Sequence, residues 1–372
     1  MFMNKERILL IGNSGLKKHG EDGQTIKVRL YLKKIQDEGF LVTFVDLEMF
    51  LKNPLTILSR IKKGIKNCDR IVLISAKRGC KTLIPFINRH NKKYQKPFIL
   101  PLIGTSVLHY SIDKLDDNQK NDFILNHNYS LCKRNKNMSK QLSKITYILP
   151  ETESLTEVFK GCYSLNNVYT LNNFREIINI NKKPANDNDC IRFVFLSRVM
   201  KNKGIFDLLS AFEQLSLDYS NIMLDIYGKL LLSKEENQDF QHYLQNSLIN
   251  YRGAIDNRVV CSTLSQYDFF VFPTRFVGEG TPGVIVESLI GGTPVLTTDF
   301  PQAHLLLNNN VDSVFCKMFD EKDLKSKLLY IIMNRNIISD LKRGASASGK
   351  KYTYDYERNK FLKYVCGVEE DK

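Results

Sequence analysis

The sequence predicts an α/β protein built from two Rossmann-like domains. Short apolar runs typical of buried strands alternate with segments of helical periodicity, which indicates parallel, doubly wound sheets with ligands at the carboxyl ends of the strands. The length of 372 residues suits two domains of ordinary size. A mostly polar stretch of Asn, Lys, Pro, Ala and Asp at 181–190 separates two such series and is expected to be the linker.

The first domain is predicted to span residues 1–180. Pro101 indicates that its strand is not a central one, because proline cannot donate to a sheet ladder. Pro85 is expected in the first turn of a helix, where its missing N–H is tolerated. The expected strands are 7–12, 41–46, 70–75, 98–104, 145–150 and 168–171, and the expected helices are 22–39, 54–66, 83–90 and 151–161.

The second domain is predicted to span residues 191–350, and a helical segment is expected within 351–372. A glycine-rich loop before residue 282 leads into a helix that ends at a Gly-Gly pair, which suits a helix C-terminus. The expected strands are 191–196, 223–227, 268–273 and 294–297, and the expected helices cover 207–212, 282–292, 321–343 and 354–365.

The net charge of +14 is unevenly distributed. Residues 1–190 carry 32 Lys and Arg against 18 Asp and Glu, whereas residues 191–372 carry 22 of each. The excess positive charge would attract the first half of the chain to anionic lipid, lipid diphosphates or nucleic acid. The alternative is a basic face that serves only solubility. The eight cysteines form no C-x-x-C pair, which favours a reducing cytoplasm over a disulfide framework or metal cluster.

Two carboxylates eight positions apart enclose the glycine-rich loop and the start of its helix, Glu279 and Glu287. Glu287 could accept hydrogen bonds from a ribose diol and Glu279 from hexose hydroxyls. The unpaired N–H groups of the first helical turn would face a diphosphate, whose charge the helix dipole favours. The alternative is a helix with one exposed glutamate and one near its N-terminus.

Two cations follow the first strand of the second domain, in a loop before a helix, Arg198 and Lys203. Arginine offers a bidentate fork to a phosphate and lysine a point charge, so a diphosphate could lie between them. The alternative is a surface loop that happens to be basic.

The segment from Glu279 to Glu287 resembles the Glu-x7-Glu motif of the retaining glycosyltransferases of family 4, also called group 1 glycosyl transferases. Thr281 replaces the family's usual aromatic residue. The run from Ser197 to Gly204 is similar to that family's Gly-Arg-(x)n-Lys-Gly phosphate clamp, with Ser197 in place of glycine. The segment 22–25, Asp-Gly-Gln-Thr, resembles the amino-terminal loop of bacterial polysaccharide-assembly members.

The resemblance implies a GT-B architecture, in which two Rossmann-like domains face a central cleft and the terminal helix packs back toward the first domain. It implies sugar transfer from a nucleotide-sugar, a UDP-sugar, with Arg198 and Lys203 stabilising the departing diphosphate and Glu279 holding the sugar. His109 is the histidine expected near the acceptor, although a plain polar residue at a strand-to-helix junction explains it equally well. The expected donor-binding residues are Glu287, Gly280, Thr281, Pro282, Gly283 and Gly23.

No metal or other cofactor is expected. Asp187-Asn188-Asp189 matches a metal-binding D-x-D, but it lies in the linker rather than at a strand end beside a nucleotide pocket. The charge and the resemblance together predict a lipid-linked saccharide acceptor and an anionic inner-membrane surface, hence a cytoplasmic, membrane-associated enzyme of capsule or O-antigen synthesis. The alternatives are a nucleotide-sugar 2-epimerase on the same fold and a noncatalytic nucleic-acid-binding protein, for which the basic half shows no recognised motif.

Overall fold

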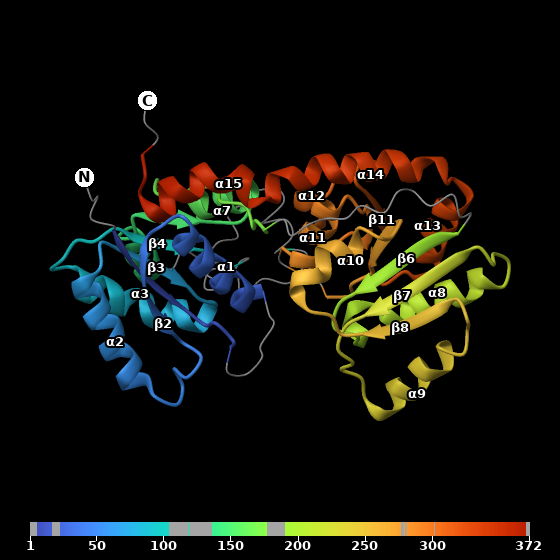
Figure 1. Ribbon diagram of the computed structural model, residues 1–372, viewed down its shortest axis with the longest axis horizontal. Helices are drawn as coiled ribbons and strands as arrows, with labels where there is room; N and C mark the ends of the chain where they lie inside the picture. Colours follow the sequence, from blue (N-terminus) through green and yellow to red (C-terminus); the bar gives the residue numbers. More distant parts are fainter. Residues whose placement is uncertain are drawn as a thin grey trace. The chain divides into compact units, whose positions relative to one another are not determined.

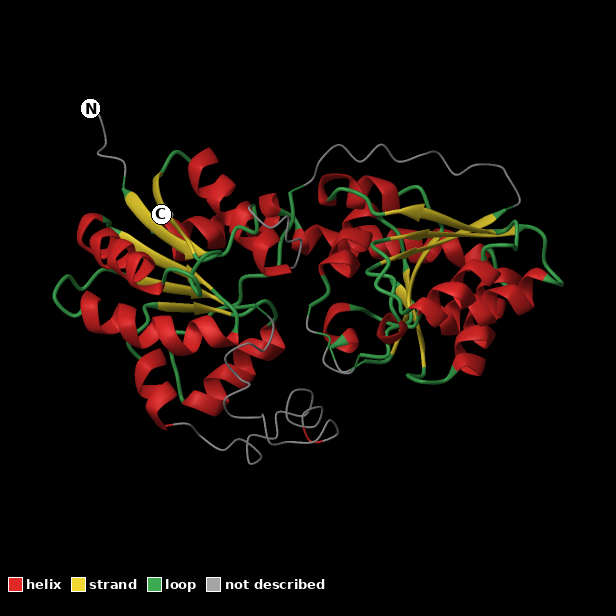
Figure 2. Ribbon diagram, turned by 90° about the horizontal axis from the view of Figure 1, so that it is seen from below, coloured by secondary structure: helices red, strands yellow, loops and turns green. Residues whose placement is uncertain are grey.

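A computed structural model gives the fold, and it describes residues 6–16, 23–103, 119, 136–176, 190–276, 279, 281–300 and 302–369. The chain divides into two compact units. Unit 1 comprises Met1–Asn173 and Glu357–Lys372, and unit 2 comprises Phe174–Tyr356. Each unit contains a parallel sheet with helices on both of its faces (Figures 1 and 2). The predicted α/β class is therefore confirmed.

Unit 1 has a five-stranded parallel sheet in the order β2-β1-β3-β4-β5. Ile8 to Ile11 of β1 are fully buried, since helices cover both faces of this strand. The strand order reverses between β1 and β3, which makes that point the switch point of the sheet. Its strands are β1 (Arg7–Gly12), β2 (Leu41–Asp46), β3 (Arg70–Ile74), β4 (Phe98–Pro101) and β5 (Tyr147–Leu149), and its first helices are α1 (Gly23–Asp37), α2 (Pro54–Asn67), α3 (Lys77–Asn91), α6 (Lys136–Leu142) and α7 (Glu153–Tyr163).

Three predictions for unit 1 are wrong. The helix α3 begins at Lys77, so Pro85 lies inside it, because an apolar face of Cys80, Leu83 and Ile87 packs along its whole length. The strand β4 is interior, between β3 and β5, and tolerates Pro101 because this residue is its last. The segment 168–171 forms only an isolated bridge to β5 and is no strand.

The segment after unit 2 returns to unit 1 through α15 (Tyr354–Phe361) and a π-helical turn (Leu362–Cys366). The Phe361 ring is fully buried and meets Tyr31 of α1 edge-on, with ring centroids 5.2 Å apart. Arg358 donates two hydrogen bonds to the Glu38 carboxylate, at 2.7 and 2.6 Å. This segment is therefore part of the packing of unit 1.

Unit 2 has a six-stranded parallel sheet in the order β8-β7-β6-β9-β10-β11. Numbered within the unit, this order is 3-2-1-4-5-6, that of dinucleotide-binding domains, and its switch point lies between β6 and β9. Its strands are β6 (Ile191–Leu196), β7 (Ile222–Tyr227), β8 (Ile249–Gly253), β9 (Phe269–Phe272), β10 (Val295–Thr298) and β11 (Ser313–Cys316), and its helices of eight residues or more are α8 (Ile205–Ser216), α9 (Lys234–Tyr243), α11 (Gly283–Gly291), α13 (Glu321–Met333) and α14 (Asn336–Gly349).

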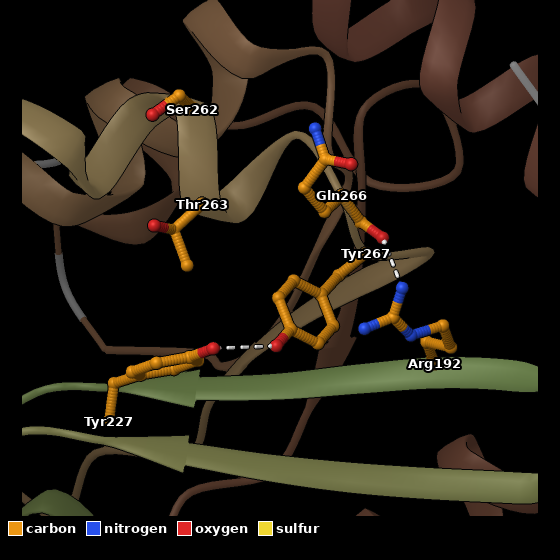
Figure 3. A pocket seen from close by; sticks show the side chains of 6 residues that line it. All are labelled: Arg192, Tyr227, Ser262, Thr263, Gln266 and Tyr267. Atoms are coloured by element: carbon orange, nitrogen blue, oxygen red, sulfur yellow. Dashed lines mark hydrogen bonds between the residues drawn. The ribbon is translucent and has the colours of Figure 1, made fainter. Parts of the chain in front are cut away.

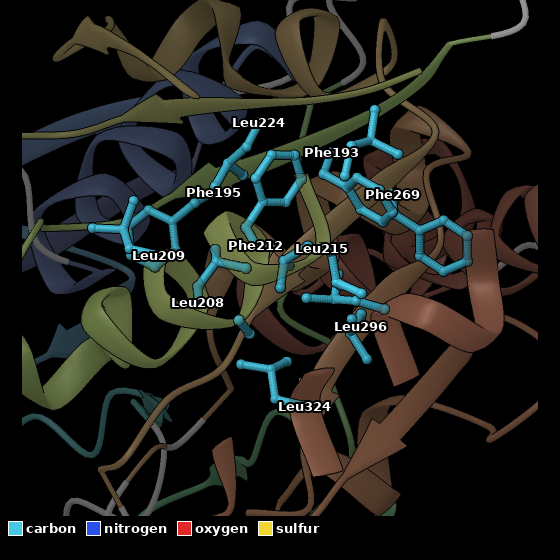
Figure 4. Packing of buried hydrophobic residues seen from close by; sticks show 14 of the residues in the cluster. Phe193, Phe195, Leu208, Leu209, Phe212, Leu215, Leu224, Phe269, Leu296 and Leu324 are labelled. Carbon is cyan, nitrogen blue, oxygen red and sulfur yellow. The ribbon is translucent and has the colours of Figure 1, made fainter. Parts of the chain in front are cut away.

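The core of unit 2 lies on both faces of this sheet because successive strand side chains point to opposite sides. Phe193 and Phe195 of β6 face α8 and α13, where they pack in one apolar cluster (Figure 4). Val194, between them, belongs to a second cluster with α11 and the short helix α10 (Val260–Leu264). Both faces of β6 and β9 are thus covered, which holds the strand ends at the switch point in place.

The helix predicted over 321–343 is two helices, since α13 ends at Met333 and α14 begins at Asn336. The helix predicted from Pro282 to the Gly-Gly pair is confirmed as α11, and Gly292 closes it with a positive φ of 74°. Of the predicted linker, Cys190 alone is described. Within the described residues, no helix is long and apolar enough to span a membrane.

Candidate functional site

The switch point of unit 2 brings two loops together. The loop after β6 ends in a 3-10 turn, Lys201–Lys203, and then in Gly204, whose φ is 72°. A side chain at Gly204 would overlap the carbonyl oxygen of Pro273, the residue after β9. The backbones approach this closely only because residue 204 is glycine, and Lys203 is therefore held beside the segment that leads to Glu279.

Lys203 and Glu279 form a buried ion pair at this point. The Lys203 ammonium donates to Oε1 of Glu279, and the two side chains are only 8% and 10% exposed. The same oxygen accepts a hydrogen bond from Oγ1 of Thr274 at 2.9 Å. The ammonium also lies 5.5 Å and 5.6 Å from the ring centroids of Phe272 and Phe276, within the range of cation–π attraction. A carboxylate and a cation thus meet at the end of β9.

Glu287 lies on the second turn of α11 and pairs with a different cation, Arg175. The Nε of Arg175 donates to Oε1 of Glu287 at 3.0 Å, and both side chains are about nine-tenths buried. Burial raises the pKa of the Glu287 carboxyl, and the charge and hydrogen bond of Arg175 oppose that rise. The loop residues Thr281 and Pro282 precede the helix, and Pro282 is its N-cap.

A continuous helix from Glu279 to Glu287 would rise about 12 Å, but only part of this segment is helical. The helix begins at Gly283, so only the part from Gly283 to Glu287 rises at the helical 1.5 Å per residue. Glu279 lies in the preceding loop, where its position is set by Lys203 and Thr274 instead. The two carboxylates are therefore held by separate contacts rather than by one continuous helix.

Arg198, Gly23, His109 and Gly280 are the remaining predicted site residues. Arg198 is exposed, and its side chain makes no hydrogen bond or ion pair with any residue that the structure describes. Gly23 is the first residue of α1 in unit 1, and a side chain there would meet nothing within 4 Å. His109 and Gly280 lie outside the described residues.

Sequence reasoning did not identify Arg175. The burial of a glutamate in the apolar helix α11 requires a cationic partner, but nothing in the sequence specifies which of the 54 lysines and arginines supplies it. Arg175 follows Asn-Asn-Phe at the end of the first series of strands, more than a hundred residues before Glu287. Only the fold brings the two together.

A cavity of about 330 Å³ lies beside the sheet of unit 2, between α10 and the strands β6 and β7 (Figure 3). Tyr267 donates to the buried Asp225 at 2.6 Å and lies 3.0 Å from the hydroxyl of Tyr227. Burial and the hydrogen bond to Asp225 raise the pKa of Tyr267 well above its usual range. None of the predicted site residues lines this cavity, whose walls are Arg192, Tyr227, Ser262, Thr263, Gln266 and Tyr267.

Comparison with known proteins finds a matching family and solved structures of similar fold. Residues 176–348 match the family described as "Glycosyl transferases group 1". No curated protein sequence matches the chain. The structure is similar to that of HepE of Anabaena in complex with UDP and glucose, with a TM-score of 0.67 and 12% identity. The similarity covers 98% of this chain and 100% of HepE.

Two further solved structures have the same fold. Sucrose-phosphate synthase from Thermosynechococcus elongatus has a TM-score of 0.65 and 12% identity, over 97% of this chain and 98% of its own. The apo form of the lipopolysaccharide outer core galactosyltransferase WaaB has a TM-score of 0.63 and 12% identity, over 97% and 99%. These likenesses establish that the fold resembles the GT-B glycosyltransferase structures.

Proposed function

Because residues 176–348 match the group 1 glycosyl transferase family, we propose that the protein moves a sugar from a UDP-sugar to a lipid-linked saccharide. The proposed transfer retains the anomeric configuration and contributes to capsule or O-antigen synthesis. The observation that carries the proposal is the buried Lys203–Glu279 pair, which lies at the switch point of unit 2 beside the start of α11. In open α/β sheets that point is where ligands bind.

Each polar group of this region has a role in the proposed reaction. The diphosphate would face the unpaired N–H groups of Gly283 and its neighbours at the N-terminus of α11. Lys203 would then release Glu279 and bind the diphosphate, where it would stabilise the negative charge that grows as the bond to the sugar breaks. Glu279, released from the ammonium, would accept hydrogen bonds from the sugar, and Glu287 would accept them from the ribose diol. Arg198 is proposed to contact the same diphosphate.

The proposed reaction needs no protein nucleophile. The bond between the anomeric carbon and the diphosphate oxygen breaks, and an acceptor oxygen forms the new bond on the same face of the sugar. The acceptor proton passes to an oxygen of the leaving phosphate. Neither a metal nor another cofactor is part of the proposal. His109 and Gly23 are proposed to lie near the acceptor and the donor phosphates.

The proposed acceptor and location at the inner membrane rest on unit 1. The helix α2 buries its apolar face and exposes cations, among them Arg60, Lys62 and Lys63. Leu51, which lies three residues before this helix, and Leu55, in its first turn, are 94% and 81% exposed. Exposed leucines beside lysines suit the interface of an anionic bilayer, where apolar side chains insert and cations meet head groups.

Nucleotide binding tests the donor site. We expect thermal stabilisation of the full chain by UDP or a UDP-sugar in a metal-free screen that also includes GDP, ADP, CMP and their sugars. The stabilisation is expected to be lost in Glu287→Ala, because the ribose diol loses its acceptor. No shift with any nucleotide would contradict the proposal. A new nucleotide-sugar formed in the absence of any acceptor would instead indicate the 2-epimerase. Nuclear magnetic resonance of the product tests whether the anomeric configuration of the sugar is retained.

Vesicle binding tests the membrane surface. We expect the protein to sediment with vesicles containing phosphatidylglycerol and to lose most of that binding in the double variant Lys62→Glu and Lys63→Glu, since each cation near an anionic surface contributes about 1 kcal/mol. A control with the same charge change in unit 2, Lys322→Glu with Lys350→Glu, should bind as the wild type does. Equal loss in both double variants would show that net charge, rather than α2, is responsible.

A further inference from the structure

Arg175 lies where the chain passes between the two units. The boundaries fall after Asn173 and after Tyr356. The backbone N–H of Arg175 donates to the carbonyl of Tyr352 at 2.7 Å, and the N–H of Tyr354 donates to the carbonyl of Arg175 at 2.9 Å. The segment at Arg175 and the segment from Tyr352 to Tyr354 are thus hydrogen-bonded to each other within unit 2. These two hydrogen bonds fix the backbone of Arg175.

The side chain of Arg175 runs along the first turn of α11. Its Nη1 donates to the carbonyl of Phe174 at 3.1 Å, and its Nε donates to Glu287 at 3.0 Å. A side chain at Gly283 would overlap Nη2 of Arg175. Gly283 was assigned to donor binding from the motif, but the structure gives it a second reason to be glycine. It leaves the room through which the guanidinium reaches Glu287.

We propose that Arg175 is a positioning residue for the donor, which orients the Glu287 carboxylate for the ribose and joins it to the segments that connect the units. This inference rests on the proposed function, because Glu287 is the group through which Arg175 acts. Two features carry it: the fixed backbone of Arg175 and the space that Gly283 provides. A cation held at both its backbone and its head group leaves Glu287 little freedom to rotate.

The same contact governs the charge of Glu287. Burial raises the pKa of this carboxyl and Arg175 lowers it. The neighbouring helix α10 presents Cys261, whose thiol has a pKa raised to about 12 and is therefore neutral near pH 7. Removing Arg175 leaves the raising effect of burial unopposed, so Glu287 becomes protonated at a higher pH. A protonated Glu287 is a weaker acceptor for the ribose, and this loss is greatest in acid.

Titration of the full chain with UDP from pH 5.5 to 8.5 tests the inference. Arg175→Ala is expected to weaken UDP binding at least tenfold at pH 6, and the decline of affinity toward acid is expected to begin at a higher pH than in the wild type. Arg175→Lys should recover part of the affinity, because an ammonium keeps the charge but not the fork geometry. Glu287→Gln should remove the acid-dependent decline, and adding Arg175→Ala to it should change little.

Two controls keep the result specific. Gly283→Ala retains Arg175 but displaces its Nη2, because an added Cβ would overlap that atom, and it should shift the acid-dependent decline of affinity in the same direction as Arg175→Ala does. Lys342→Ala breaks an ion pair with Asp268 in the same unit and should bind UDP as the wild type does. Circular dichroism and thermal unfolding verify the fold of each variant.

The outcomes separate this inference from the proposed function. Wild-type protein that binds none of the nucleotides contradicts the proposed function and the inference with it. Wild-type binding together with unchanged binding in Arg175→Ala and Gly283→Ala contradicts the inference alone. A loss of UDP affinity in Arg175→Ala that is equal at every pH also contradicts the inference. An arginine with only a structural role would not change the pH at which UDP affinity begins to decline.

Discussion

Unit 1 and unit 2 each bury a Lys–Glu ion pair, and the two pairs differ in their surroundings. In unit 1, Lys27 of α1 donates to Glu151, after β5, at 2.8 Å and to the carbonyl of Leu102 at 2.6 Å, with both side chains only 4% exposed. In unit 2, the Lys203–Glu279 pair is bordered by aromatic rings. One of these rings, Phe276, is about half exposed.

The difference shows that burial of an ion pair does not by itself identify a site. Glu151 follows the edge strand β5, and a backbone carbonyl closes its pair with Lys27. Glu279 follows β9, one of the two strands that flank the switch point of unit 2. We therefore expect the pair of unit 1 to maintain stability and the pair of unit 2 to exchange partners with a ligand.

Replacing Lys27 should have the largest effect on stability. Lys27→Met leaves Glu151 buried without its cation, and breaking a buried pair in this way costs about 3–5 kcal/mol. Denaturant unfolding would measure the loss, and UDP affinity of the folded fraction should be unchanged. A loss below about 1 kcal/mol, within the range of exposed pairs, would contradict the structural role of this pair.

Replacing Lys203 should instead affect the reaction. Lys203→Ala removes a cation from the departing diphosphate, and the loss of one such electrostatic contact lowers turnover by about 10²–10³-fold. Sugar transfer under saturating donor measures this effect. If Lys203→Ala lost stability as Lys27→Met does while keeping its turnover, the two pairs would have the same structural role.

Two glycines extend the comparison to the backbone. Gly204 has a positive φ and no room for a side chain, so Gly204→Ala should destabilise the protein by about 1–3 kcal/mol and disturb Lys203 next to it. Gly23, at the start of α1, has open space around it, and Gly23→Ala should change stability by less than about 0.5 kcal/mol. Thermal unfolding of both variants measures the contrast, and equal losses would contradict it.

Much of the fold could be predicted because local sequence determines it. Apolar runs predicted β1, β2, β3 and, in unit 2, β6, β7, β9 and β10, whereas β8 and β11 were not predicted. The Gly-Gly pair predicted the end of α11. The start of α3 and the interior place of β4 could not be predicted, because packing against distant strands outweighed the local effects of Pro85 and Pro101.

The candidate site was predicted as residue types but not as contacts. The sequence indicated Glu279, Glu287 and Lys203 from their spacing and from the resemblance. It placed Lys203 and Arg198 beside a diphosphate, but it did not indicate that Lys203 pairs with Glu279. Such partners depend on which strands meet at the switch point, which is a property of the whole sheet. Arg175 was missed for the same reason.

The return of residues 357–372 to unit 1 has a consequence for the synthesis of the protein. Phe361, Val365 and Cys366 are buried in unit 1, yet the ribosome makes them after all of unit 2. Domains usually fold in the order in which they are made. Here the first unit to emerge cannot complete its packing until the second has been translated, so unit 2 is the first to have its whole sequence available for folding.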